Sequence, residues 1–164
     1  MFVFLFLTLL FSFSVNFADF GDFLCVFFEE IRRRGEVLPW KNLEAFSLSV
    51  FSLRKAQYIN APSDTMHFFD RGIIDVIAYM KLEGLAVSDN YKEDCGKYKY
   101  NTTVFYTPIW KEIYKNDTQR KEDMESAIAI EKALITTYKS FGYSIIPIPQ
   151  LPTAERVDFI LSKI

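Results

Sequence analysis

The stretch Phe68–Val76 (FFDRGIIDV) places an acid and a base at the end of an apolar run. A carboxylate at a strand tip, here Asp70, is a good magnesium ligand or water anchor beside a phosphate. The planar guanidinium of Arg71 could neutralise phosphate charge. Asp75 lies four residues after Arg71 and would share its face of a helix. These three side chains therefore form a candidate site for a phosphate group and its Mg²⁺ ion.

A structural interpretation of the same residues is equally open. On a helix, Arg71 and Asp75 would form an i,i+4 ion pair that contributes only a small fraction of the folding free energy. Asp70 would then cap the first turn of that helix. The spacing of the residues favours neither interpretation over the other, so the elements around them have to be considered.

A second candidate group lies in the basic segment 107–123 (TPIWKEIYKNDTQRKED). Lys111, Arg120 and Lys121 could close over phosphates, as basic residues on mobile lids do. The alternative is a solvated helix start in which these cations balance the acidic residues of the same segment. A third charged stretch, EEIRRRG, contains Glu30, and its three arginines are too few to indicate a nucleic-acid site.

Apolar runs that alternate with helical patterns would position these residues. Short buried strands are predicted at 65–69, 102–109 and 143–149. Helical periodicity predicts helices at 41–59, 71–84 and 153–164. A further long helix is predicted to start near a capping pair, Asn116 and Gln119, and to end at Gly142. The polar stretch 88–100 is a short helix or a loop.

Continuously apolar strands separated by helices are typical of an α/β fold with a mostly parallel sheet that helices cover on both faces. Ligands of such sheets bind beyond the carboxyl ends of the strands. Asp70 and the segments 108–110 and 149–152 each follow a predicted strand directly. We therefore expect them to gather at one edge of the sheet, where an α/β protein carries its chemistry.

The composition is that of one globular domain without a basic field. The chain has 164 residues and a net charge of −2, so its overall charge does not favour nucleic acid as a partner. The two cysteines, Cys25 and Cys95, are too far apart for a zinc motif or a disulfide framework and indicate reduced thiols in a cytoplasmic protein. The single histidine, His67, lies in a strand-like run, where a packed role is favoured over a catalytic one.

The first 28 residues differ from the rest of the chain. Ten of the 17 phenylalanines precede Glu29, and no lysine or arginine occurs before Arg32. We treat 1–28 as an aberrant Phe-rich segment and 29–164 as the domain. Three interpretations compete: a secretory signal, a membrane-associated segment that makes contact through residues 2–15, and a strand-bearing start that has diverged or been misread, which we favour. In a secreted protein, Asn101 and Asn116 would be glycosylation sequons.

Several separated motifs resemble one known family in order and spacing. They are GEVLPW at 35–40, FFDRGIIDVIAYMKLEG at 68–84, YNTTVFYTPIWKEIYKND at 100–117, AIAIEKAL at 127–134 and FGYSIIPIPQLPTAERVDFIL at 141–161. The family is the predicted-ATPase AAA domain shared by NadR-type ribosylnicotinamide kinases and by a GTP- and phosphoinositide-binding photoreceptor protein. The likeness covers roughly Glu29 to the end, with Ile109 in place of a second proline.

The resemblance implies a three-layer P-loop NTPase-like fold that binds ATP or GTP with Mg²⁺. It implies a Walker B role for Asp70, with Mg²⁺ held through water, and a lid role for Arg120. Arg71 and Lys111 would offset phosphate charge, and Lys121 and Asp75 would line the cofactor site. By rough position, Glu29 or Glu30 would lie near the hydroxyl of a small-molecule phosphoryl acceptor.

One defining motif of that family is missing from the sequence. A P-loop has the pattern G-x-x-x-x-G-K-[ST], and no two of the six glycines have the required spacing. We therefore expect a truncated, mis-started or degenerate member in which FVFLFLTLL serves as a surrogate first strand. Its function is then that of an impaired nucleotide-binding ATPase or kinase-like protein, with a non-catalytic pseudo-NTPase and a secreted or membrane-anchored protein as alternatives.

Overall fold

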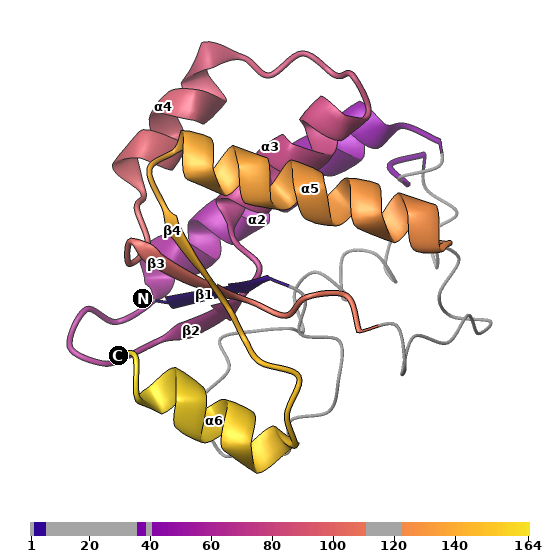
Figure 1. Cartoon of the computed structure of the whole chain (residues 1–164). Helices are drawn as coiled ribbons and strands as arrows, with labels where there is room; N and C mark the ends of the chain where they lie inside the picture. The colour runs from indigo at the N-terminus through magenta and orange to yellow at the C-terminus, as the bar shows by residue number, and fades with distance from the viewer. Residues whose placement is uncertain (1, 6–35, 39–40, 111–122) are drawn as a thin grey trace.

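Four parallel strands form the centre of the molecule (Figure 1). A computed structural model describes residues 2–5, 36–38, 41–110 and 123–164. The strands are β1 (Phe2–Leu5), β2 (Phe68–Asp70), β3 (Thr103–Tyr106) and β4 (Ser144–Pro147). They lie in the order β2-β1-β3-β4 and run parallel, so their carboxyl ends all lie at the same end of the sheet, which we call its carboxyl edge.

The first residues of the chain fill the middle of this sheet. In β1, Val3 lies opposite Phe69 of β2 on one side and Val104 of β3 on the other. A strand with parallel neighbours on both sides has its backbone N–H and C=O groups paired within the sheet. The prediction that the apolar start of the chain serves as a surrogate first strand is confirmed for residues 2–5, and the predicted boundary at residue 28 lies outside the described residues.

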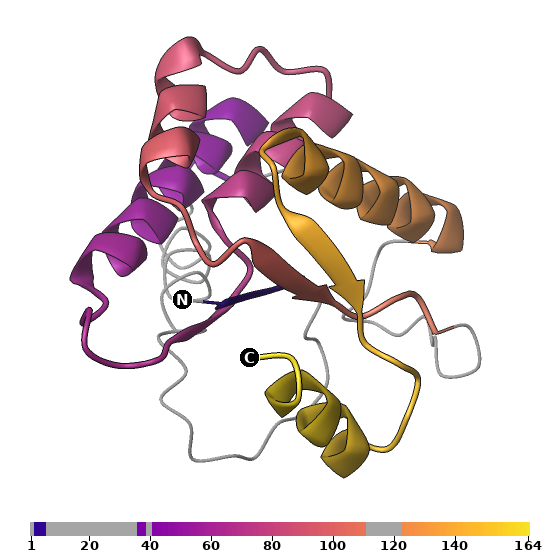
Figure 2. The ribbon, with the colours of Figure 1, turned by 60° about the vertical axis from the view of Figure 1, so that its left-hand side comes forward.

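Helices cover both faces of the sheet, as Figures 1 and 2 show from two directions. On one face lie α2 (Leu43–Asn60), α3 (Ile73–Leu82), α4 (Asp89–Lys97) and α5 (Met124–Ser140), and on the other lies α6 (Thr153–Leu161). Within the described residues, no helix combines the length and apolar character that crossing a bilayer requires.

The side chains of β2, β3 and β4 alternate between two apolar layers, as the pleat requires. Phe69 and Val104 are buried on the side of α2–α5, whereas Phe105 is buried on the side of α6. The smaller layer joins the sheet to α6 through Ile148 and Ile160. The predicted three-layer α/β fold with a parallel sheet is therefore confirmed.

The helix ends follow local signals in the sequence. Gly84 and Gly142, at φ values of 70° and 84°, follow α3 and α5 in the left-handed conformation that glycine adopts without strain. The start of α5 differs from the one expected near Asn116, a residue that lies outside the described residues. The helix begins at Met124, where the Asp123 carboxylate accepts a hydrogen bond from the Ser126 N–H (2.8 Å).

A proline at Val3 tests whether β1 holds the sheet together. Val3→Pro removes a ladder hydrogen bond and leaves a carbonyl unsatisfied, so we expect a loss of at least about 2 kcal/mol in the free energy of unfolding. The exposed strand edges should also promote aggregation. Urea denaturation and light scattering measure both effects, with Val3→Ile as a control that retains the N–H. A soluble proline variant of unchanged stability would contradict a central position for β1.

Candidate functional site

Segments that follow three parallel strands meet at the carboxyl edge of the sheet. The Ile109 N–H, beyond β3, donates to Glu131 Oε1 of α5 (3.1 Å). The Gln150 side-chain amide, beyond β4, donates to the Ile109 carbonyl (3.3 Å). Asp70 ends β2 at the same edge and lies opposite Phe4 of the central strand. The prediction that these three segments gather at one edge is confirmed.

Arg71 has an unusual backbone conformation directly after β2. Its φ of 67° lies in the left-handed region, which costs a non-glycine residue about 1–3 kcal/mol. The guanidinium donates a hydrogen bond to the Tyr79 hydroxyl (3.0 Å) and lies 5.7 Å from the centre of that ring. Burial disfavours its charged form, but the Tyr79 hydroxyl and the carboxylates of Asp75 and Asp70 outweigh this and raise the pKa of Arg71.

Asp75 is buried in the first turn of α3, with only 4 % of its surface exposed. Its Oδ2 atom accepts hydrogen bonds from the Gly72 N–H (2.8 Å) and from the Tyr138 hydroxyl of α5. Burial raises the pKa of this carboxyl group, against the opposing effects of Arg71, of the two hydrogen bonds and of Arg54. The helix cap expected of Asp70 in the structural interpretation is thus formed by Asp75.

A further tyrosine, Tyr100, contacts the same turn, and Tyr143 in turn binds the backbone of Tyr100. The Tyr100 hydroxyl accepts a hydrogen bond from the Ile73 N–H (3.2 Å), and the Tyr143 hydroxyl accepts one from the Tyr100 N–H (3.2 Å). Burial raises the pKa of both phenols, so they are neutral at physiological pH. The sequence did not single out Tyr100 or Tyr138 as contacts of this turn. The one available signal is that a buried tyrosine hydroxyl needs a partner.

The structure describes three of the seven residues that the sequence predicts for the site. Asp70, Arg71 and Asp75 lie within six residues of one another at the carboxyl edge. Lys111, Arg120, Lys121 and Glu30 lie outside the described residues, so their roles stay predictions.

The single histidine and the described cysteine lie in packed positions. His67 is buried and hydrogen-bonds through Nε2 to the Thr65 hydroxyl (2.7 Å). Burial raises the pKa of the Cys95 thiol to about 12, which makes it a poor nucleophile. Within the described ranges, no three His, Cys, Asp or Glu side chains converge as a metal cluster.

Comparison with known proteins gives one match. A family model described as an AAA domain matches residues 23–156, most of the chain. No curated protein and no solved structure matches.

Replacement of Asp75 tests the cost of burying its charge. The folded pKa lies above the unfolded value of about 3.9, so the folded state binds the proton more tightly and the contribution of Asp75 to stability falls as pH rises through this range. Asp75→Asn retains an acceptor for Gly72 and Tyr138 but no charge. We expect the free energy of unfolding of Asp75→Asn, relative to that of the parent chain, to increase as the pH is raised from about 4 to about 7, the range above the unfolded pKa. Urea denaturation at several pH values measures this difference.

The matched control is Asp123→Asn, at the start of α5. The hydrogen bond from the Ser126 N–H lowers the pKa of Asp123, so its contribution is present above the unfolded pKa and lost as pH falls. The relative stability of this variant should therefore change with pH in the opposite direction. Equal pH slopes for the two variants would contradict the account of Asp75.

Proposed function

Because this chain belongs to the AAA domain family, a P-loop NTPase-type family of nucleotide-binding proteins, we propose that it binds ATP or GTP with Mg²⁺ at the carboxyl edge of its sheet. The observation that carries the proposal is the position of Asp70. It ends β2 directly beside the central strand β1 and opens the turn into α3. This is where open α/β sheets bind their ligands.

The single carboxylate of Asp70 suits an Mg²⁺ ion whose other ligands are water molecules and phosphate oxygens. Mg²⁺ in nucleotide sites usually keeps several waters and takes one or two carboxylates together with phosphate oxygens. Asp70 supplies one such carboxylate, half-buried at the strand end. The ion, when bound, neutralises charge on the phosphates. Asp70 would hold it through a water molecule.

The other proposed contacts are cationic. Arg71, Lys111 and Arg120 would offset phosphate charge, with Lys121 and Glu30 near the ligand. The Arg71 guanidinium lies against the Tyr79 ring and donates a hydrogen bond to its hydroxyl. Asp75 is buried and hydrogen-bonded within the turn, so we assign its contribution to the backbone of Gly72 rather than to direct contact with the ligand.

The sequence limits how tightly this site can bind. Without G-x-x-x-x-G-K-[ST], the backbone cradle and lysine that grip the phosphates are missing, and each charge-assisted hydrogen bond lost costs about 1.5–3 kcal/mol. We therefore propose weak binding and impaired transfer to a small-molecule phosphoryl acceptor. The same observation favours a second candidate, a pseudo-NTPase that binds nucleotide without turning it over.

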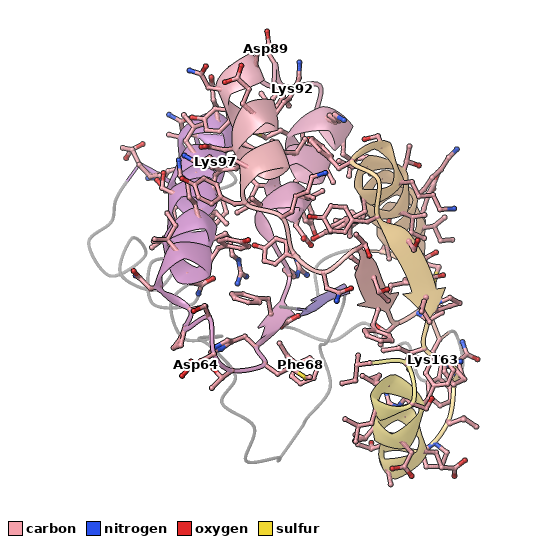
Figure 3. The ribbon with its side chains drawn as sticks, turned by 90° about the vertical axis from the view of Figure 1, so that its left-hand side faces the viewer. Asp64, Phe68, Asp89, Lys92, Lys97 and Lys163 are labelled. Atoms are coloured by element: carbon pink, nitrogen blue, oxygen red, sulfur yellow. The ribbon has the colours of Figure 1, made fainter. Side chains whose placement is uncertain are left out.

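Replacement of Asp70 tests the proposed metal role. In titrations with fluorescent ATP and GTP analogues, Mg²⁺ should strengthen binding to the parent chain. Asp70→Asn should lose about tenfold in affinity with Mg²⁺ present and little without it, because the amide lacks the charge that holds the hydrated ion. The control is Asp64→Asn, because Asp64 is exposed before the amino end of β2 (Figure 3).

The outcomes separate the two candidate functions. Binding with measurable phosphate release supports an NTPase or kinase-like enzyme, and binding without release supports the pseudo-NTPase. Absence of binding by the parent chain at millimolar nucleotide, or equal effects of the two substitutions, would overturn the proposed nucleotide site.

A further inference from the structure

The turn from β2 to α3 consists of two residues. Only Arg71 and Gly72 separate Asp70, the last residue of the strand, from Ile73, the first of the helix. In so short a connection, the orientation of the peptide between Arg71 and Gly72 decides how the chain leaves Asp70. The Arg71 side chain starts from the same turn, in which Arg71 is the residue held at φ 67°.

That peptide is held through a relay that starts on another helix. The Tyr138 hydroxyl, on α5, donates to Asp75 Oδ2, and the same oxygen accepts the Gly72 N–H (2.8 Å). Tyr138 and Asp75 are both buried, so water does not compete for these hydrogen bonds. Removing the hydroxyl would leave the carboxylate with one donor fewer and free to turn away from Gly72.

Packing closes the same turn from two sides. A Cβ atom at Gly72 would meet Tyr100 Cε2 and the Tyr138 hydroxyl oxygen, each at 2.9 Å. The backbone at Gly72 therefore lies directly against these two side chains, with φ −133° and ψ −176°. Glycine is needed here for close approach and not for its left-handed freedom.

We propose that Tyr138 is a positioning residue for the nucleotide site: through Asp75 and the Gly72 N–H, it fixes the turn that presents Asp70 and Arg71. The inference rests on the proposed function of Asp70 as the residue that holds hydrated Mg²⁺. Tyr138 itself touches neither metal nor nucleotide. Small displacements of a positioned group weaken binding and catalysis strongly. Loss of the Tyr138 hydroxyl should therefore weaken Mg²⁺-dependent nucleotide binding.

Two tyrosine-to-phenylalanine substitutions test the relay. Tyr138→Phe removes the hydroxyl bound to Asp75. Tyr143→Phe removes a hydroxyl from the same buried cluster, one that binds the Tyr100 N–H instead. The readout is the ratio of the dissociation constants of a fluorescent ATP analogue without and with Mg²⁺. We expect this ratio to fall about tenfold in Tyr138→Phe and to stay unchanged in Tyr143→Phe.

A purely structural role would leave that ratio unchanged in the folded protein while lowering the melting temperature of both variants. An unchanged ratio in Tyr138→Phe would therefore overturn the proposal. Equal losses in the two variants would overturn it as well, because they would show that any buried hydroxyl of the cluster has the same effect.

The rate of hydrogen exchange at the Gly72 amide tests the relay without any nucleotide or metal. In Tyr138→Phe, the Gly72 amide should exchange at least about tenfold faster, beyond any change shared with the amides of β3. In Tyr143→Phe it should not. If the parent chain shows no Mg²⁺-dependent binding, the proposed function fails by itself. Faster Gly72 exchange would then still support the relay, and unchanged exchange would overturn it.

Discussion

The buried carboxylate of Asp75 is the contact on which the turn from β2 into α3 depends. One oxygen of this group accepts both the N–H that opens α3 and the Tyr138 hydroxyl of α5. A buried charge is costly unless it is paired and hydrogen-bonded, and here two donors and the nearby positive charges of Arg71 and Arg54 reduce the cost. The packing of α3 on α5 and the conformation of the turn beside Asp70 are therefore parts of one arrangement.

Much of the fold could be predicted from local patterns. Short apolar runs bounded by turn residues became β2, β3 and β4, and helical periodicity located α3 and α5. These signals suffice because the apolar period and the flanking turn residues that mark a strand or a helix lie close together in the chain. The gathering of Asp70 with the segments after β3 and β4 follows from the parallel sheet, so it could be predicted without any side-chain contact.

The polar contacts of the site could not be predicted in the same way. Tyr138 lies 63 residues after Asp75, and Tyr100 lies 27 after Ile73. A tyrosine within an apolar stripe has the same periodicity as any core aromatic, and the partner of its hydroxyl is set only when the helices pack. The left-handed residue is equally hidden, because a neighbouring glycine is the usual choice and the structure uses Arg71 instead.

The turn after β2 differs from the other left-handed positions because its left-handed residue is an arginine, Arg71. Among the described residues, the positive φ values after α3 and α5 are taken by Gly84 and Gly142, where no side chain is needed, and Arg71 is the one non-glycine residue. Glycine at 71 would relieve the strain but would remove the guanidinium from the edge where Asp70 ends its strand. The strain is sustained because Asp75, Tyr100 and Tyr138 hold the next two residues, Gly72 and Ile73, in place. Strain that the surroundings over-determine clusters at ligand sites, and this supports the nucleotide site proposed at Asp70.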